Sequence, residues 1–242
     1  MVYGRGLRPL SIATVVTLTS AVALVFFYAP TDADQGIIQK IFYIHVPMAI
    51  VALCGFIAGG VFAVLHLRSG ERRWDLRSYV TIHLSVVLAV GVLLTGSIWA
   101  RASWGHWWVW DEPMLVVFLI IFLLYVTYWP LRFSIEDPER QSRYASVFAI
   151  MAGAFVPLCF GAVRMAQNLT HPQAGTMTTS GPASVTLTFL VSLAGVALLY
   201  TTLCTYELAS KNATSKLRSL RRRLAGDDDF AAPARSAAPQ LP

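Results

Sequence analysis

Six long apolar runs constrain this sequence more than any other feature. A helix that crosses a bilayer needs about 20 predominantly apolar residues, and each run reaches or approaches that length. The runs are Leu10–Ala29, Ile41–Leu67, Ser78–Ala100, Met114–Leu131, Tyr144–Val163 and Ala183–Tyr206. We therefore predict an all-α membrane protein, with six transmembrane helices that form one domain over residues 1–210.

The composition supports this class and excludes two others. Hydrophobic residues make up 56% of the 242 residues and charged residues only 13%, whereas a soluble domain carries about 25% charged residues. The net charge of +6 gives no reason to expect nucleic acid, because the basic residues fall in loops. No phosphate-binding Gly-x-x-x-x-Gly-Lys loop is present in the sequence, so we expect no ATPase activity.

The distribution of basic residues predicts the orientation. Cytoplasmic loops of membrane proteins carry an excess of lysine and arginine. All but three of the 19 lysines and arginines fall before the first run, in the second and fourth connectors, or after the sixth run. The other three are Lys40, Arg101 and Arg164. We therefore predict that both termini are cytoplasmic and that the first, third and fifth connectors face outward, towards the periplasm or exterior.

The chain changes character beyond Lys211. A basic stretch that ends in Arg221–Arg223 is followed by three aspartates and an Ala/Pro-rich segment. Such a composition is typical of disordered chains, and clustered arginines bind anionic lipid headgroups. We predict a disordered cytoplasmic tail over residues 211–242.

Five of the seven tryptophans lie between Trp99 and Trp110, in and beside the connector between the third and fourth helices. Tryptophan is enriched at membrane interfaces, so one interpretation is a dense aromatic belt. The alternative is a platform for a large flat ligand, formed by the ring faces of four tryptophans. These are Trp104, Trp107, Trp108 and Trp110.

Two histidines fall near the same outer face. His45 lies at the expected start of the second helix and His171 in the fifth connector. Two neutral imidazoles beside an aromatic surface match the requirements of a haem site, in which imidazole nitrogens bind the iron axially. Arg101 and Arg164 are candidates to pair with the haem propionates, although Arg164 also suits a side chain that extends from the bilayer to the headgroups. A solvated loop histidine remains the alternative for each imidazole.

Other polar residues near these segments have simpler interpretations. Asp111 suits the N-cap of the fourth helix, with Pro113 just inside it, and a carboxylate there is also able to orient an imidazole or an arginine. We expect His106 to be a solvated loop residue. His83 lies within the third helix, and we expect it to have a hydrogen-bonded structural role.

The motif Trp104-Gly105-x-Trp107-Trp108-x-Trp110-Asp111 resembles the WWD signature of haem-handling membrane proteins. Together with Tyr43-Ile44-His45-Val46-Pro47 and Asn168-Leu169-Thr170-His171, it is similar to the haem exporter protein C (CcmC) family. The resemblance covers residues 1–210. It implies that His45 and His171 bind haem b transiently as axial ligands, above a platform that includes the tryptophans and Asp111.

The resemblance also implies partners and a location. CcmC proteins present haem to the chaperone CcmE during maturation of c-type cytochromes, in a complex with CcmA, CcmB and CcmD at the inner membrane. This activity is delivery rather than bond-making. Two alternatives stay open from the sequence: a CcsA-like or CcmF-like protein that attaches haem to apocytochrome, and a permease subunit without a cofactor.

Overall fold

The computed structural model describes residues 4–165, 171 and 181–224. The elements are α1 (Gly4–Phe27), η1 (Ile37–Ile41), α2 (Phe42–Ser69), α3 (Arg72–Trp104), α4 (Pro113–Val126), α5 (Tyr128–Phe133), α6 (Pro138–Met165) and α8 (Ala183–Leu224). Within these residues no strand forms, and six helical segments are long and apolar enough to span a membrane. The predicted all-α class with six spans is thereby confirmed.

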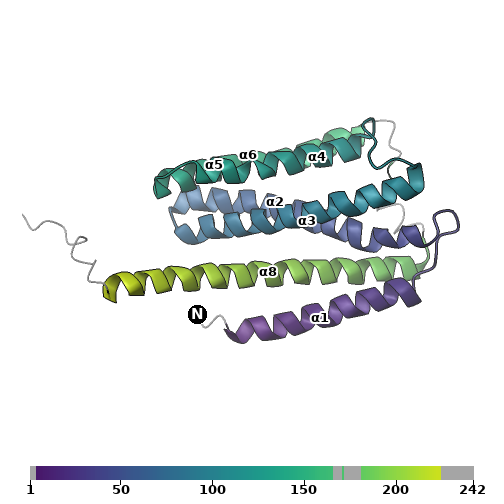
Figure 1. Ribbon diagram of the computed structural model, residues 1–242, viewed down its shortest axis with the longest axis horizontal. Helices are drawn as coiled ribbons and strands as arrows, with labels where there is room; N and C mark the ends of the chain where they lie inside the picture. The colour runs from purple at the N-terminus through teal and green to yellow at the C-terminus, as the bar shows by residue number, and fades with distance from the viewer. Residues whose placement is uncertain (1–3, 166–170, 172–180, 225–242) are drawn as a thin grey trace, which may run out of the picture.

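The helices lie side by side along one axis (Figure 1). Helices α2 and α3 occupy the middle, α4, α5 and α6 flank them on one side, and α8 followed by α1 on the other. The connectors between α1 and α2 and between α3 and α4 lie at the same end of the bundle. We call this the tryptophan end, and we call the opposite end, with residues 68–77 and 132–143, the basic end.

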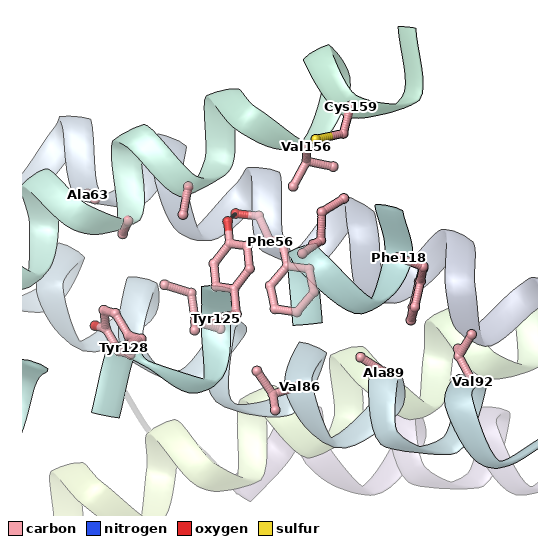
Figure 2. Packing of buried hydrophobic residues seen from close by; sticks show 14 of the residues in the cluster. Phe56, Ala63, Val86, Ala89, Val92, Phe118, Tyr125, Tyr128, Val156 and Cys159 are labelled. Carbon is pink, nitrogen blue, oxygen red and sulfur yellow. Dashed lines mark hydrogen bonds between the residues drawn. The ribbon is translucent and has the colours of Figure 1, made fainter. Parts of the chain in front are cut away.

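An aromatic stack holds the centre of the bundle. The rings of Phe56 on α2 and Tyr125 on α4 are both fully buried, and they stack with centroids 3.8 Å apart (Figure 2). The Tyr125 hydroxyl donates a hydrogen bond of 3.3 Å to the carbonyl of Phe56. Because the hydroxyl is satisfied, the ring is buried without the cost of an orphaned polar atom.

Helices α2 and α6 approach each other through two glycines. A Cβ added at Gly60 would lie 3.0 Å from the Ala149 carbonyl oxygen, and one added at Gly153 would lie 3.3 Å from the Cα of Gly60. Small residues at such crossings let helix backbones approach closely. Close packing matters in a membrane because the hydrophobic effect does not drive helices together in lipid. The pair therefore fixes α6 against the central helices.

The fourth span differs from its expected form. It was predicted as one helix over Met114–Leu131, but it is divided into α4 and α5 at Thr127. Pro130 lies one turn beyond the break, and its missing N–H removes the bond that a continuous helix would make to the carbonyl of Val126.

The sixth span is longer than the sequence pattern indicated. Helix α8 has 42 residues and extends beyond the other helices at the basic end (Figure 1). The expected boundary at residue 210 therefore falls inside a helix, and residues 211–224 are helical rather than disordered. The rest of the predicted tail, residues 225–242, lies outside the described residues.

Polar side chains at the basic end pair with one another. Arg132 on α5 forms a two-pronged ion pair with Asp75 on α3, at 2.8 and 2.7 Å, and also donates to the Tyr128 hydroxyl at 2.9 Å. The Arg132 and Asp75 side chains are each only 10% exposed. His83 on α3 bonds to Glu207 on α8 at 3.0 Å. These pairs connect three helices at one end of the bundle.

Candidate functional site

The tryptophan-rich connector begins where α3 is stopped. Gly105 follows the last helical residue with a φ of 78°, a left-handed conformation that glycine adopts at little cost. Its N–H donates to the Arg101 carbonyl at 3.1 Å, and an Arg101 guanidinium N–H donates to its carbonyl. Helix α3 ends at this turn, and the connector that carries Trp107, Trp108 and Trp110 follows.

His45 lies one turn inside α2, because η1 and the start of α2 precede it without interruption. Its side chain is half-buried and points to α3, where Nδ1 lies 2.9 Å from the hydroxyl oxygen of Thr95. A hydrogen bond of this kind fixes the orientation of an imidazole ring.

His171 lies against the end of α3. Its ring centroid is 6.4 Å from that of Trp99 and 6.5 Å from that of Trp104. These two tryptophans contact each other edge to face at 5.0 Å. The Trp99 indole N–H donates to the Gln35 side chain at 3.1 Å, so the first connector holds one of the two rings in place.

The two histidines converge although 126 positions separate them along the chain (171 − 45). His45 and His171 are close enough to interact electrostatically. They come from different segments: His171 contacts the rings of Trp99 and Trp104, and His45 contacts Thr95 and Gly96, one turn earlier on α3. We call His45, His171, Trp99 and Trp104 the two-histidine site.

The remaining tryptophans form an exposed surface beside this site. Trp107 is 60% exposed and Trp110 is 72% exposed, and Trp110 packs edge to face on Trp108 at 6.0 Å. The Trp108 indole nitrogen is buried and has no hydrogen-bond partner among the described residues. Large indole faces that remain open are available to a flat apolar ligand.

A match to a known family accompanies this geometry. The family model described as "Heme exporter protein C" matches residues 2–224. The chain belongs to the heme exporter protein C family.

Relatives that carry the same name agree with the family model. The protein of Rhodobacter capsulatus is 28% identical over 225 residues, which cover 91% of this chain and 92% of the relative. That of Bradyrhizobium diazoefficiens is 32% identical over 202 residues, covering 81% and 72%. That of Escherichia coli K12 is 31% identical over 149 residues, covering 62% and 60%. The resemblance to the heme exporter protein C family, inferred from three short motifs, is therefore confirmed.

The acidic residues at the start of α4 differ from expectation. Glu112, not Asp111, occupies the N-cap position of α4, with Pro113 as the first helical residue. Asp111 is exposed in the turn, whereas the Glu112 side chain is 2% exposed. The expected cap was wrong by one residue, because proline at the first helical position puts the cap on the residue directly before it.

The two arginines predicted to pair with the haem propionates differ in how much of each the structure describes. Arg101 is exposed at the end of α3, within the region of the site, and one of its N–H groups is used by Gly105. Arg164 lies in α6, one residue before its end, but its side chain falls outside the described residues. The pairing of either with a propionate stays a prediction.

The other histidines have local roles. His106 is exposed in the connector, as expected for a solvated residue. His66 pairs through Nδ1 with the Glu71 carbonyl at 3.1 Å. The bond between His83 and Glu207 confirms the expected hydrogen-bonded role of His83.

Several residues that shape the site have no distinctive pattern in the sequence. Trp99 was counted in the cluster but not assigned to the platform, although its ring contacts His171. Thr95 and Gly96 gave no signal, because small and hydroxyl residues are common in transmembrane helices. A helical projection would have placed Trp99 one turn beyond Thr95 on the same face of α3.

A separate hollow lies nearby at the tryptophan end. It has a volume of about 460 Å³, between the first connector and the start of α8, and its lining includes Asp32, Tyr43 and Val185. Neither His45 nor any tryptophan lines it. The two-histidine site is therefore distinct from this pocket.

Proposed function

We propose that this chain binds haem at the two-histidine site and delivers it to a chaperone of the CcmE type. Membership of the heme exporter protein C family supports a role in haem handling for cytochrome c maturation. The finer assignment rests on one observation: His45 lies within electrostatic range of His171, whose ring contacts Trp99 and Trp104.

The donor set suits haem iron. Two imidazoles supply the axial ligands of b-type haem, and no thiolate or further acid is needed. The open indole faces of Trp107 and Trp110 and the nearby Trp108 would cover the macrocycle, while Asp111 and the two arginines are candidates to hold its polar edge. Haem is the cargo here, held noncovalently.

Delivery is a ligand exchange. A ligand supplied by the chaperone would replace His45 or His171 on the iron. Any covalent bond to haem would form on the partner, in a separate step. An open aromatic surface at the end of the bundle supports such an exchange, because a partner reaches the haem without entering the helices. This chain would supply binding and positioning, and the CcmA ATPase of a complex with CcmB and CcmD would supply the energy for release.

The proposed orientation places the tryptophan end in the periplasm and both termini in the cytoplasm. The basic residues support this orientation, since they gather at the opposite end of the bundle. We place the chain in the inner membrane, where CcmE would meet it. Alkaline phosphatase fused after Leu224 should be inactive in intact cells, whereas phosphatase fused after Gly105 should be active; the reverse pattern would contradict the orientation.

Haem content of single variants tests the axial assignment. The detergent-purified protein should show a Soret band and yield a b-type pyridine haemochrome. His45→Ala and His171→Ala should each lower haem affinity by at least about 10–100-fold, the cost of even an indirect perturbation of a ligand. Both variants should keep the unfolding temperature of the parent protein.

His106→Ala is the matched control, because His106 is an exposed histidine of the same end of the bundle. It should retain haem. Equal haem occupancy in the parent protein and in the His45→Ala/His171→Ala double variant would rule out the axial assignment. A preparation that stays colourless after haemin addition would rule out haem binding at this site altogether.

A further inference from the structure

The side chain that holds His45 has a defined direction of hydrogen bonding. Thr95 has one hydroxyl hydrogen, and its oxygen lies 2.7 Å from the Gly91 carbonyl and 3.2 Å from the Val92 carbonyl in its own helix. Carbonyls only accept, so the hydroxyl hydrogen is given to them. The lone pairs of the oxygen then remain for His45 Nδ1, at 2.9 Å.

This direction decides the tautomer of His45. Since the Thr95 oxygen accepts, Nδ1 of the imidazole carries the proton and donates. A neutral imidazole has a single N–H, so Nε2 keeps its lone pair. A metal binds the nitrogen that carries the lone pair, and the partner of the other nitrogen sets which one that is.

The neighbouring residue fixes the plane of the ring. A Cβ added at Gly96 would lie 2.9 Å from His45 Cε1 and 3.5 Å from Nδ1. The distance from the added Cβ to His45 Cε1 is too short for two carbon atoms in contact. An imidazole ring is rigid, so it could not bend away from the added atom. The ring therefore packs directly on the backbone of α3, in a space that only glycine leaves.

We propose that Thr95 and Gly96 are positioning residues that preset His45 as an Nε2 ligand before haem arrives. Thr95 sets the tautomer and Gly96 admits the ring against α3. The consequence for haem rests on the proposed function, because it takes His45 as an axial ligand. The tautomer itself is a property of the haem-free chain and is measured without haem.

The first experiment reads the tautomer directly. The full-length protein, purified without haem in nanodiscs and labelled with ¹⁵N in its histidine rings, is examined by NMR, with His45→Gln used to assign the His45 signals. Nδ1 should be protonated and Nε2 unprotonated in the parent protein and in Thr95→Ser. Thr95→Val has the same shape but no acceptor, and it should lose this single tautomer. A parent protein with the proton on Nε2 would overturn the proposal.

The second experiment measures the consequence for haem. In a haemin titration, Thr95→Val should weaken affinity by about 10–100-fold, the usual effect of removing a partner of a ligating imidazole. Thr95→Ser should restore it. The midpoint potential of the residual haem in Thr95→Val should differ from that of the parent, a change that loss of packing alone would not produce. Gly96→Ala should displace the ring and weaken affinity although Thr95 is intact.

The outcomes separate the two proposals. A parent protein that binds no haemin would overturn the proposed function, while the ring tautomer would still decide the role of Thr95. A parent that binds haemin as tightly as Thr95→Val and Gly96→Ala do would overturn the positioning roles and leave the proposed function intact. The unfolding temperature of each variant, with Thr95→Ser as the folded control, excludes misfolding as the cause.

Discussion

The basic end and the tryptophan end of the bundle differ in how far their polar and aromatic side chains are enclosed. At the basic end, the guanidinium of Arg132 is enclosed by Asp75 and Tyr128, and its Cζ lies 5.1 Å from the centroid of the Tyr79 ring. At the tryptophan end, Trp107 and Trp110 present most of their surface to the exterior. Single rings such as Phe133 are exposed at the basic end as well, but the exposed tryptophans lie at the tryptophan end.

This difference distinguishes residues that stabilise the fold from residues that are able to bind a ligand. Buried ionic groups that are satisfied by neighbouring helices hold a structure in one arrangement, and they have little left to offer a ligand. An exposed aromatic surface at the end of a membrane bundle suits either a flat ligand or an interface belt. The haem hypothesis therefore belongs to the tryptophan end, and changes at the two ends should have separable effects.

The largest effect on stability is expected from Arg132→Ala. This change leaves the Asp75 carboxylate buried without its cation, and loss of one partner of a buried ion pair costs about 3–5 kcal/mol of unfolding free energy. Thermal unfolding in detergent should detect it. Haem affinity of the protein that remains folded should equal that of the parent.

Arg73→Ala is the control for this prediction. Arg73 pairs with Glu71, but the two side chains are 61% and 46% exposed, and a surface pair contributes only about 0–1 kcal/mol. A large loss from Arg73→Ala, or no loss from Arg132→Ala, would remove the distinction between enclosed and open pairs. Loss of haem binding from Arg132→Ala alone would show that the ends are coupled.

The second effect concerns the indole surface. Replacing Trp107 and Trp108 by alanine should weaken haem capture by about tenfold or more, since ring contacts contribute about 0.5–1.5 kcal/mol each beyond the area they bury. Trp74→Ala is the control, because Trp74 stacks on Phe62 at the basic end. Haemin titration of the two variants is the measurement. Equal effects would favour the aromatic-belt interpretation.

A smaller effect is expected from His83→Gln. The change alters the hydrogen bond between Glu207 and a His83 side chain that is 36% exposed, while Glu207 keeps Lys211 at 3.4 Å. Stability should fall by less than about 1 kcal/mol, and haem content by visible absorption should be unchanged. A fall in haem content would instead favour an intramembrane haem, as in the CcsA-like alternative.

The smallest effect should come from the cap of α6. The Asp137 carboxylate accepts from the amides of Arg140 and Glu139, and these bonds lower its pKa. Because the folded pKa is the lower one, the stabilisation is complete above the unfolded value of about 3.9 and is lost as the pH falls through the folded value. Asp137→Asn, which keeps a capping oxygen, should flatten the dependence of unfolding temperature on pH in this range; an unchanged dependence would assign it to another group.

The sequence predicted the six spans because each is a long apolar run, and length together with apolar composition indicates whether a helix crosses a bilayer. It did not predict the break at Thr127 or the helical continuation to Leu224. Apolar periodicity carries no information about a single missing N–H at Pro130. The basic residues after Lys211 are good helix formers, but their composition also suits disorder.

The sequence predicted which types of residue form the candidate site, but not which of them contact one another. His45 and His171 stood out because histidines are few, and Trp104 because tryptophans cluster. Their convergence depends on how α2, α3 and the fifth connector pack, which no local pattern encodes. Thr95 and Gly96 are ordinary residues for a membrane helix, and only the position of the His45 ring distinguishes them.

Helix α8 also acts as a spacer. Its 42 residues rise about 63 Å at 1.5 Å per residue, whereas a bilayer with its headgroups is about 40–45 Å thick. Roughly 20 Å of stiff, positively charged rod therefore stands clear of the membrane at the basic end. Leu217, Leu220 and Leu224 are exposed along this rod, and they share a single unbroken helix with Ala183 at the tryptophan end.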